Sequence, residues 1–276
     1  LIVTQGWRLT CVIGGLVIWF AFLPLVWFFI KEHRPEYYGL LPDGAITEEA
    51  TTGTDQMIEK GIKYADEVQE VEFTLRQAIK TPAYWLLVLV VGLHGMIAPT
   101  INLHCIPFLT DIGIEPIRAA AMLSIIAIAG IPSRFFAGFL TDRVKINQLC
   151  FLMAAALLLE AAGLTIFLLN QTVNMIYVWF VFHGIGTGAF WTLMSPIRGR
   201  YFGRKAFGSI SGFSSLLMTP AGVAAPVYAG WVYDTTGSYI AVFTMFAALL
   251  GFAAILACLI APPKPPAVSA DIRRIL

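Results

Sequence analysis

Long apolar stretches dominate this 276-residue chain, and shorter polar segments separate them. A helix needs roughly 20 apolar residues to cross a hydrocarbon core of about 30 Å. The stretches that qualify lie at about residues 11–30, 83–105, 119–140, 148–169, 174–196, 210–232 and 239–261. This pattern predicts an all-α polytopic membrane protein with seven transmembrane helices. The first stretch is too long for a signal peptide and lacks a small-residue cleavage site, so it is predicted to be a span.

One long polar stretch, residues 31–81, follows the first span. It contains most of the acidic residues and several Pro and Gly residues, a composition typical of a solvent-exposed linker. Its end places Phe73, Leu75, Ala78 and Ile79 among polar residues, which indicates a short amphipathic helix at the membrane interface. We therefore expect four parts, at residues 1–30, 31–81, 82–262 and 263–276, of which the third is a six-span bundle.

The composition agrees with a membrane protein and excludes several other classes. Hydrophobic residues make up 58% of the chain and charged residues 13%, and the mean hydropathy is +0.77. An ordinary soluble enzyme and a disordered tail are therefore excluded. The net charge of +1 gives no basic field that would attract nucleic acid. The four cysteines lie far apart, so neither a disulfide framework nor a metal site is predicted, and we expect no cofactor.

The distribution of positive charge predicts how the spans are oriented. Of the 18 Lys and Arg residues, fifteen lie in the 31–81 stretch, around 143–145 and 198–205, and in the C-terminal tail. Only Arg8 and Arg118 fall on the opposite side, and Arg134 lies within a span. Since cytoplasmic loops carry the positive charge, we expect the N-terminus outside and the C-terminus in the cytoplasm of a plasma (inner) membrane.

A short motif recurs at an interval that suggests internal symmetry. The sequence Ala137-Gly138 followed by Asp142 near the end of the third span returns as Ala229-Gly230 followed by Asp234 near the end of the sixth. In the orientation above, the first copy ends inside and the second outside. Spans two to four and five to seven therefore resemble inverted-topology repeats, which are common in secondary transporters.

Arg134 is the most prominent candidate for function. It lies about 12 Å along the helix from Asp142, too deep for easy contact with water. An arginine within a membrane is costly unless it is paired or faces a cavity, and its planar fork matches a carboxylate. We interpret Arg134 as an anion-binding residue; a structural ion pair or a snorkelling side chain is the alternative.

The second span is unusually polar, with His94, Asn102 and His104 around Pro99. The two histidines are about 15 Å apart in helical rise, so they cannot bind one metal ion. They are candidates for substrate contact or proton coupling, although hydrogen bonds between helices would explain His94 equally well. Pro99 interrupts the backbone ladder, as in helices that bend or line a cavity.

Glu160 lies in the middle of the fourth span. Burial would favour its neutral form, which makes it a candidate proton-coupling carboxyl group. Because no polar stripe surrounds it, a hydrogen-bonded or lipid-edge carboxylic acid is the preferred interpretation.

The fifth span carries Gly184, Gly186 and Gly188, which permit close helix approach or bending. Pro220 and Pro226 in the sixth span indicate a broken, cavity-lining helix.

Charged residues at the predicted cytoplasmic ends suggest a gate. Asp142 and Arg143 follow the third span, and Arg200 and Arg204 lie between the fifth and sixth. A carboxylate at one helix end and basic residues at another can close a path and release it when the helices rock. Anchoring by positive charge would explain the arginines without a gate, but not Asp142.

Several motifs resemble those of the major facilitator superfamily. Gly138 with Asp142-Arg143 looks like a partial copy of its loop signature, and Gly6-Trp7-Arg8 resembles the start of a sixth span. The segments from Arg34 to Gly44, Tyr201 to Gly212 and Pro226 to Tyr239 resemble the oxalate:formate antiporter and monocarboxylate porter groups. The resemblance implies that the seven spans correspond to the sixth through twelfth spans of a twelve-span carrier. The chain also begins with Leu1 and not Met, and we expect it to be a fragment or a processed product.

The resemblance also implies roles for individual residues. Substrate arginines of the family lie in the eighth span, which places that role on Arg134, with Gly138 one turn on. No Lys or Arg occurs between Phe207 and Tyr233, where oxalate exchangers carry a lysine, so a monoanion is favoured. We expect a secondary carrier for a small organic anion, working by proton symport or anion exchange, with a six-helix N-terminal half and the lipid bilayer as partners. A drug exporter, a non-transporting receptor and an intramembrane enzyme are the alternatives, and the last lacks a recognisable nucleophile–base pair.

Overall fold

The computed structural model describes residues 2–29, 72–203 and 205–264, and all regular secondary structure in these ranges is helical. The chain divides into two units, Leu1–Glu70 and Val71–Leu276. Seven helical segments of the described ranges are long and apolar enough to cross a membrane, which confirms the predicted all-α membrane architecture. Most of the predicted linker, Arg204 and the predicted tail from residue 265 onward lie outside the described residues.

The first unit contains one predicted span. It consists of α1 (Ile2–Val17), the π-helical turn η1 (Ile18–Phe22) and α2 (Leu23–Phe29). Pro24 has no backbone N–H, and the π-helical turn lies directly before it, with the Leu23 N–H donating to the Ile18 carbonyl. Gly6 interrupts α1 with a positive φ of 76°.

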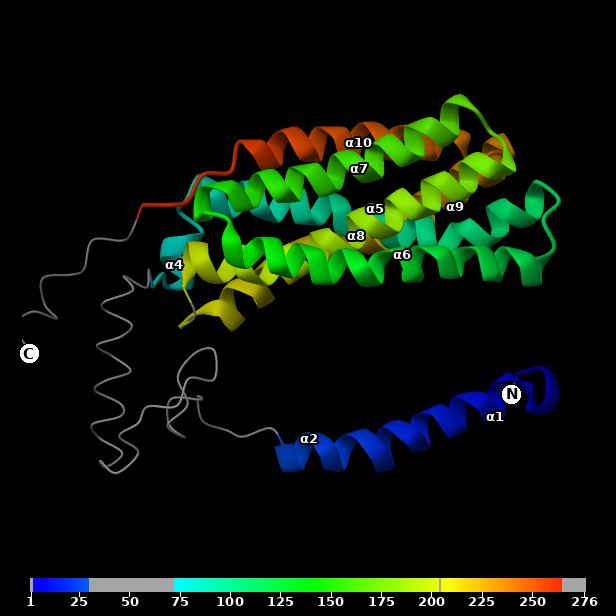
Figure 1. The fold of residues 1–276 in the computed structure, drawn as a ribbon, viewed down its shortest axis with the longest axis horizontal. Coiled ribbons are helices and arrows are strands. Elements are labelled where there is room, and N and C mark those ends of the chain that lie inside the picture. Colours follow the sequence, from blue (N-terminus) through cyan, green and yellow to red (C-terminus); the bar gives the residue numbers. More distant parts are fainter. Residues whose placement is uncertain (1, 30–71, 204, 265–276) are drawn as a thin grey trace, which may run out of the picture. The chain divides into compact units, whose positions relative to one another are not determined.

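The second unit is a bundle of six long helices that run side by side (Figure 1). They are α5 (Pro82–Asp111), α6 (Pro116–Arg143), α7 (Leu149–Leu169), α8 (Val173–Phe202), α9 (Phe207–Thr236) and α10 (Ile240–Cys258). Two short helices, α4 (Leu75–Ala78) and the 3₁₀ turn η4 (Ile146–Gln148), lie at the ends of the longer ones. The α4 helix falls within the segment predicted to be a short amphipathic helix. It packs on the bundle, because Phe73 is buried and its N–H donates to the Phe202 carbonyl.

Local signals in the sequence set the helix boundaries. The Thr81 hydroxyl caps α5 by accepting from the Tyr84 N–H, and prolines start α5 and α6 where no N–H is needed. The α8 helix extends beyond the apolar stretch predicted to end at Pro196. It stops at Gly203, whose φ of 80° is readily adopted only by glycine. Polar residues thus continue this helix past its apolar part.

The packing of the six helices follows the symmetry suggested by the repeated motif. The α6 helix packs mainly on α8, and its counterpart α9 packs mainly on α5. The remaining pair, α7 and α10, packs together and against α8 and α5. Each second helix of one repeat therefore rests on the first helix of the other, as expected for two interlocked repeats. Ala137 and Ala229, the first positions of the motif, are both buried.

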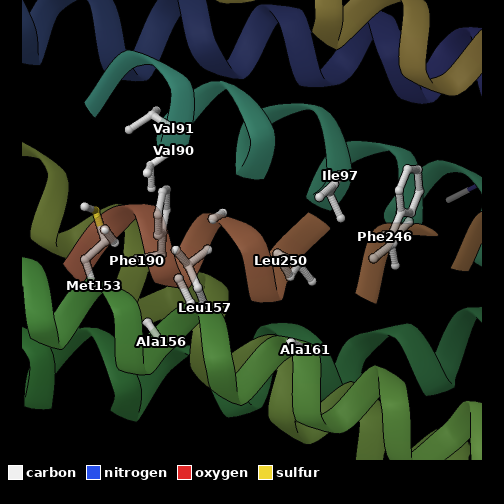
Figure 2. Close-up of a cluster of buried hydrophobic side chains, with 14 of the residues drawn as sticks. Val90, Val91, Ile97, Met153, Ala156, Leu157, Ala161, Phe190, Phe246 and Leu250 are labelled. Atoms are coloured by element: carbon white, nitrogen blue, oxygen red, sulfur yellow. The ribbon is translucent and has the colours of Figure 1, made fainter. Parts of the chain in front are cut away.

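The core lies between α5, α7, α8 and α10. Figure 2 shows side chains of this cluster, among them Val90 and Ile97 from α5, Leu157 from α7, Phe190 from α8 and Phe246 from α10. These side chains are fully buried, whereas α6 and α9 each leave a long apolar face exposed in this chain. All four cysteines are free.

Glycines bring α6 and α8 together closely. A Cβ atom on Gly188 would lie 2.7 Å from the Gly130 carbonyl oxygen, and one on Gly184 would collide with the Ile126 carbonyl. The Ser133 hydroxyl donates to the Ile185 carbonyl across the same seam. The glycine-rich fifth span predicted from the sequence therefore provides close helix approach on this side.

Candidate functional site

Arg134 lies on the exposed side of α6, next to the face that packs on α8. Its helical neighbours Gly130 and Thr141 are buried, while Ala127 is exposed and Gly138 is half-buried. The small-residue face predicted around Arg134 is therefore divided between the α8 seam and an open surface. The Arg134 residue itself is exposed.

An open pocket of about 390 Å³ is lined by Ile131, Arg134, Phe135 and Gly138. Ile131 and Phe135 are exposed hydrophobic side chains, 52% and 78% accessible. Among the described residues, no carboxylate lies within ion-pair distance of the Arg134 guanidinium. Arg134 thus presents a fixed positive charge in apolar surroundings, an arrangement that attracts an anionic group.

The three polar residues of α5 that the sequence singled out lie in different environments. Asn102 is exposed, His104 is half-buried and His94 is fully buried. His104 Nε2 lies 3.0 Å from the Pro226 carbonyl oxygen, so this nitrogen carries the proton and donates it. Its Nδ1 lies 3.2 Å from the Tyr239 hydroxyl. His104 therefore connects α5 to α9 and to the start of α10.

His94 meets Glu160, which agrees with the alternative that His94 forms hydrogen bonds between helices. The His94 Nε2 atom donates a hydrogen bond of 2.9 Å to Glu160 Oε1, and His183 Nδ1 lies 2.9 Å from Oε2. The Thr187 hydroxyl also donates to Oε2, at 3.1 Å. The hydrogen-bonded interpretation of Glu160 is therefore confirmed and the lipid-edge interpretation is wrong: the carboxyl group is fully buried at the junction of α5, α7 and α8. We call His94, Glu160, His183 and Thr187 the buried carboxylate cluster.

Gly186 makes room for the carboxylate. A Cβ atom at this position would collide with Glu160 Cγ and would lie 2.7 Å from the Ala156 carbonyl oxygen. The α8 helix thus offers Gly184 and Gly188 to α6 on one side, and His183, Gly186 and Thr187 to Glu160 on the other. Gly186 was predicted to permit bending, and its contacts show that it permits close packing around Glu160.

Aromatic rings separate the buried carboxylate cluster from the surface. The Phe190 ring stacks on the His94 imidazole with 3.8 Å between ring centroids. The Trp191 ring approaches the same imidazole edge-on at 5.7 Å, and Trp191 is 48% exposed in this chain. His94 is thus one side chain away from the open surface of the unit.

The predicted gate residues lie where α6 and α8 end. Asp142 and Arg143 are exposed, and the Arg143 guanidinium lies 3.4 Å from the centre of the Phe139 ring. An Arg200 guanidinium nitrogen donates to the Val144 carbonyl at 3.4 Å. This bond joins the ends of α6 and α8, while Arg204 lies outside the described residues.

The prolines predicted to bend their helices lie inside continuous helices. Pro99 lies within α5, and Pro220 and Pro226 lie within α9. Because Pro226 offers its carbonyl to His104, it contributes to the contact between α5 and α9. The bending itself stays a prediction.

Sequence reasoning missed His183 and Thr187 and did not identify the partners of Glu160. One signal was available: His183, Gly186, Thr187 and Phe190 fall at i, i+3, i+4 and i+7, so they form one face of α8. On this face Gly186 has no side chain, so it leaves space for a partner of His183. That the partner is Glu160 could not be predicted, because it depends on how α7 packs against α8.

Comparisons with known proteins agree with the helical architecture. The family model of the Major Facilitator Superfamily matches residues 1–165 and 150–275 of the chain. Mouse monocarboxylate transporter 12 is 29% identical over 158 residues, which are 55% of this chain and 32% of that protein. Human monocarboxylate transporter 7 is 28% identical over 172 residues, which are 62% of this chain and 32% of that protein.

A third relative is the uncharacterized MFS-type transporter C18.02 of Schizosaccharomyces pombe. It is 30% identical over 168 residues, which are 57% of this chain and 35% of that protein. The chain spans about a third of the length of the curated relatives that it matches.

Proposed function

Since the chain belongs to the Major Facilitator Superfamily, we propose that it forms the C-terminal part of a secondary carrier that moves a small organic anion, in particular a monocarboxylate, by alternating access. The observation that carries this proposal is Arg134, whose guanidinium has no carboxylate partner among the described residues and lines an open pocket on the surface of the membrane-spanning helix α6. A bidentate contact to one carboxylate would compensate its charge. Two of the relatives above are named as monocarboxylate transporters, which supports the same substrate class.

The rest of the substrate path would come from a six-helix N-terminal half. The exposed apolar faces of α6 and α9 suit such a partner, because both carry large hydrophobic side chains near Arg134 or Pro226, such as Phe135 and Val227. Asn102 lies on the exposed side of α5 and is available as a further polar contact to the substrate. His104 would limit how far α5 and α9 separate, because it bonds to the Pro226 carbonyl.

The orientation proposed from the charges places the end of the bundle that holds Asp142, Arg143 and Arg200 in the cytoplasm of a plasma (inner) membrane. Arg200 already bonds to the backbone beside the end of α6. Separation of the ends of α6 and α8, beyond the glycine contacts that hold the middles of these helices together, would break this bond, so the two helix ends are suited to act as a cytoplasmic gate.

The proposal is tested by transport assays on the complete carrier in proteoliposomes. Labelled pyruvate, a small monocarboxylate, is supplied outside vesicles preloaded with unlabelled pyruvate, and tetraphenylphosphonium is supplied in parallel as a lipophilic cation. We expect saturable pyruvate counterflow and no cation transport. Cation transport without pyruvate transport would favour a drug exporter and contradict the proposal, as would pyruvate binding without counterflow, the behaviour of a receptor.

A further inference from the structure

The buried carboxylate cluster is a charged group that anion binding at Arg134 does not require. Glu160, His94 and His183 are each at most 1% exposed, and they come from three different helices. A carboxylate flanked by two neutral imidazoles carries one net negative charge in a medium where charge is costly. One added proton makes the cluster neutral. Such a group is suited to take up and release one proton.

The cluster has polar atoms with no partner in the described chain. His94 Nδ1 and His183 Nε2 are buried and make no hydrogen bond, and the short His183–Glu160 contact lacks hydrogen-bond alignment. Buried polar atoms are usually paired, and unpaired ones call for a functional explanation. In a neutral His94 whose Nε2–H donates to Glu160, Nδ1 is a free base that accepts a proton. The half-exposed Trp191 covers that imidazole.

No other charged group of the described helices compensates the cluster directly. The α10 helix contains no charged residue, and Glu160 is the only one in α7. On α6, Arg118, Asp142 and Arg143 lie near the helix ends, and Arg134 lies on the open side. The other charged or titratable side chains of the elements around the cluster lie in other turns of their helices: Tyr84, His104, Cys105 and Asp111 on α5, Cys150 on α7, Tyr177, Arg198, Arg200 and Tyr201 on α8, and Cys258 on α10.

Arg134 is connected to the cluster through α8. Gly130 lies one helical turn before Arg134 and contacts Gly184 and Gly188, which flank Gly186 beside Glu160. Because α6 and α7 both pack on α8, their axes lie within about two interhelix spacings of 8–10 Å each. Across a low-dielectric interior, charges at that separation still interact. A bare Arg134 cation favours the negative form of the cluster, and an anion bound to Arg134 cancels this effect.

We propose that the buried carboxylate cluster of His94, Glu160 and His183 is a proton-binding site, and that it is loaded when an organic anion binds to Arg134. This inference rests on the proposed function. The cluster takes one proton from water on one side of the membrane, changes from one negative charge to neutral, and gives the proton to water on the other side. Because the coupling is reciprocal, acid pH strengthens anion binding by the same factor by which the anion strengthens proton binding.

The test measures anion and proton movement together, in the complete carrier reconstituted in proteoliposomes that contain a pH-sensitive dye. Labelled pyruvate is the anion, and the variant is Glu160→Gln, which keeps the shape but removes the negative charge that would hold the proton in the cluster. Pyruvate counterflow at equal pH is expected to stay within about threefold of the wild type, while protons moved per pyruvate fall at least tenfold. The wild-type apparent affinity for pyruvate is expected to rise about fivefold or more on acidification, and the Glu160→Gln affinity is not. Glu115→Gln, at the exposed start of α6, is the matched control and should behave as the wild type.

The possible results are distinct. Lack of pyruvate transport by the wild type overturns the proposed function, whereas pyruvate transport without proton movement overturns the present inference alone. An unchanged number of protons moved per pyruvate in Glu160→Gln also overturns it. So does a Glu160→Gln protein that loses both pyruvate counterflow and proton movement although it elutes from size-exclusion chromatography as a folded protein.

A second measurement serves if Glu160→Gln does not fold. An imidazolium quenches a neighbouring indole, so the fluorescence of Trp191, obtained as the difference between wild type and Trp191→Phe, reports protonation of His94. The pH midpoint of this signal is expected to rise when pyruvate is added. A midpoint that does not respond to pyruvate contradicts the proposal.

Discussion

Gly130 of α6 and Gly188 of α8 are in backbone contact: a Cβ atom on Gly188 would lie 2.7 Å from the Gly130 carbonyl oxygen. This contact fixes the position of α6 along the axis of α8 at Gly130. Arg134 follows Gly130 by one helical turn. The other side of α8 holds Glu160. One helix therefore supports both the candidate anion-binding arginine and the buried carboxylate cluster.

Gly188→Val should destabilise the bundle by forcing α6 away from α8. Overpacking a tight contact costs about 1–3 kcal/mol. The measurement is thermal unfolding of the purified protein in detergent, where the variant should melt several degrees lower. Gly199→Ala, on the same helix but with open space around a new Cβ atom, is the control and should leave the melting temperature nearly unchanged.

Thr187→Val should weaken the buried carboxylate cluster without changing side-chain volume. The threonine hydroxyl donates to Glu160 Oε2, and a hydrogen bond to a charged group contributes about 1.5–3 kcal/mol. Thr187→Ser keeps the hydroxyl and should retain most of the stability in the same unfolding assay. Equal losses in both variants would show that the methyl group, and not the hydrogen bond, matters at this position.

His104→Leu should loosen the contact between α5 and α9. The substitution leaves the Pro226 carbonyl without its additional donor and the Tyr239 hydroxyl without its partner, at a cost of about 1–3 kcal/mol. The same melting assay measures the loss. Tyr239→Phe removes only the second of these bonds and should have the smaller effect; a larger effect would mean that the tyrosine, not the histidine, holds the two helices together.

The orientation can be tested by labelling single cysteines in a cysteine-free background. Gln171→Cys introduces a thiol in the loop between α7 and α8, and Asn147→Cys introduces one near the start of α7; both positions are exposed. In intact cells a membrane-impermeant maleimide should label residue 171 and not residue 147 until the membrane is opened. The reverse pattern would contradict the orientation derived from positive charge.

The sequence alone predicted the membrane-spanning helices, because span length and hydropathy determine them. The glycines at 184, 186 and 188 also indicated close packing. The partners of Glu160 were not predicted because they are on other helices: His94 precedes it by 66 residues, and His183 follows it by 23. Which side of α8 faces α6 and which faces α7 depends on tertiary packing, and helical periodicity gives only the grouping of residues on a face.

The most direct test of the central claim, that Arg134 binds the transported anion, is pyruvate counterflow by the Arg134→Ala variant of the complete carrier. Arg118→Ala is the matched control, because Arg118 is an exposed arginine on the same helix but lies in its first turn. Removing the guanidinium leaves the carboxylate of the bound anion without its bidentate partner, so Arg134→Ala should lose most of its counterflow while inserting normally into membranes. Arg118→Ala should transport like the wild type. Normal counterflow by Arg134→Ala would contradict the account.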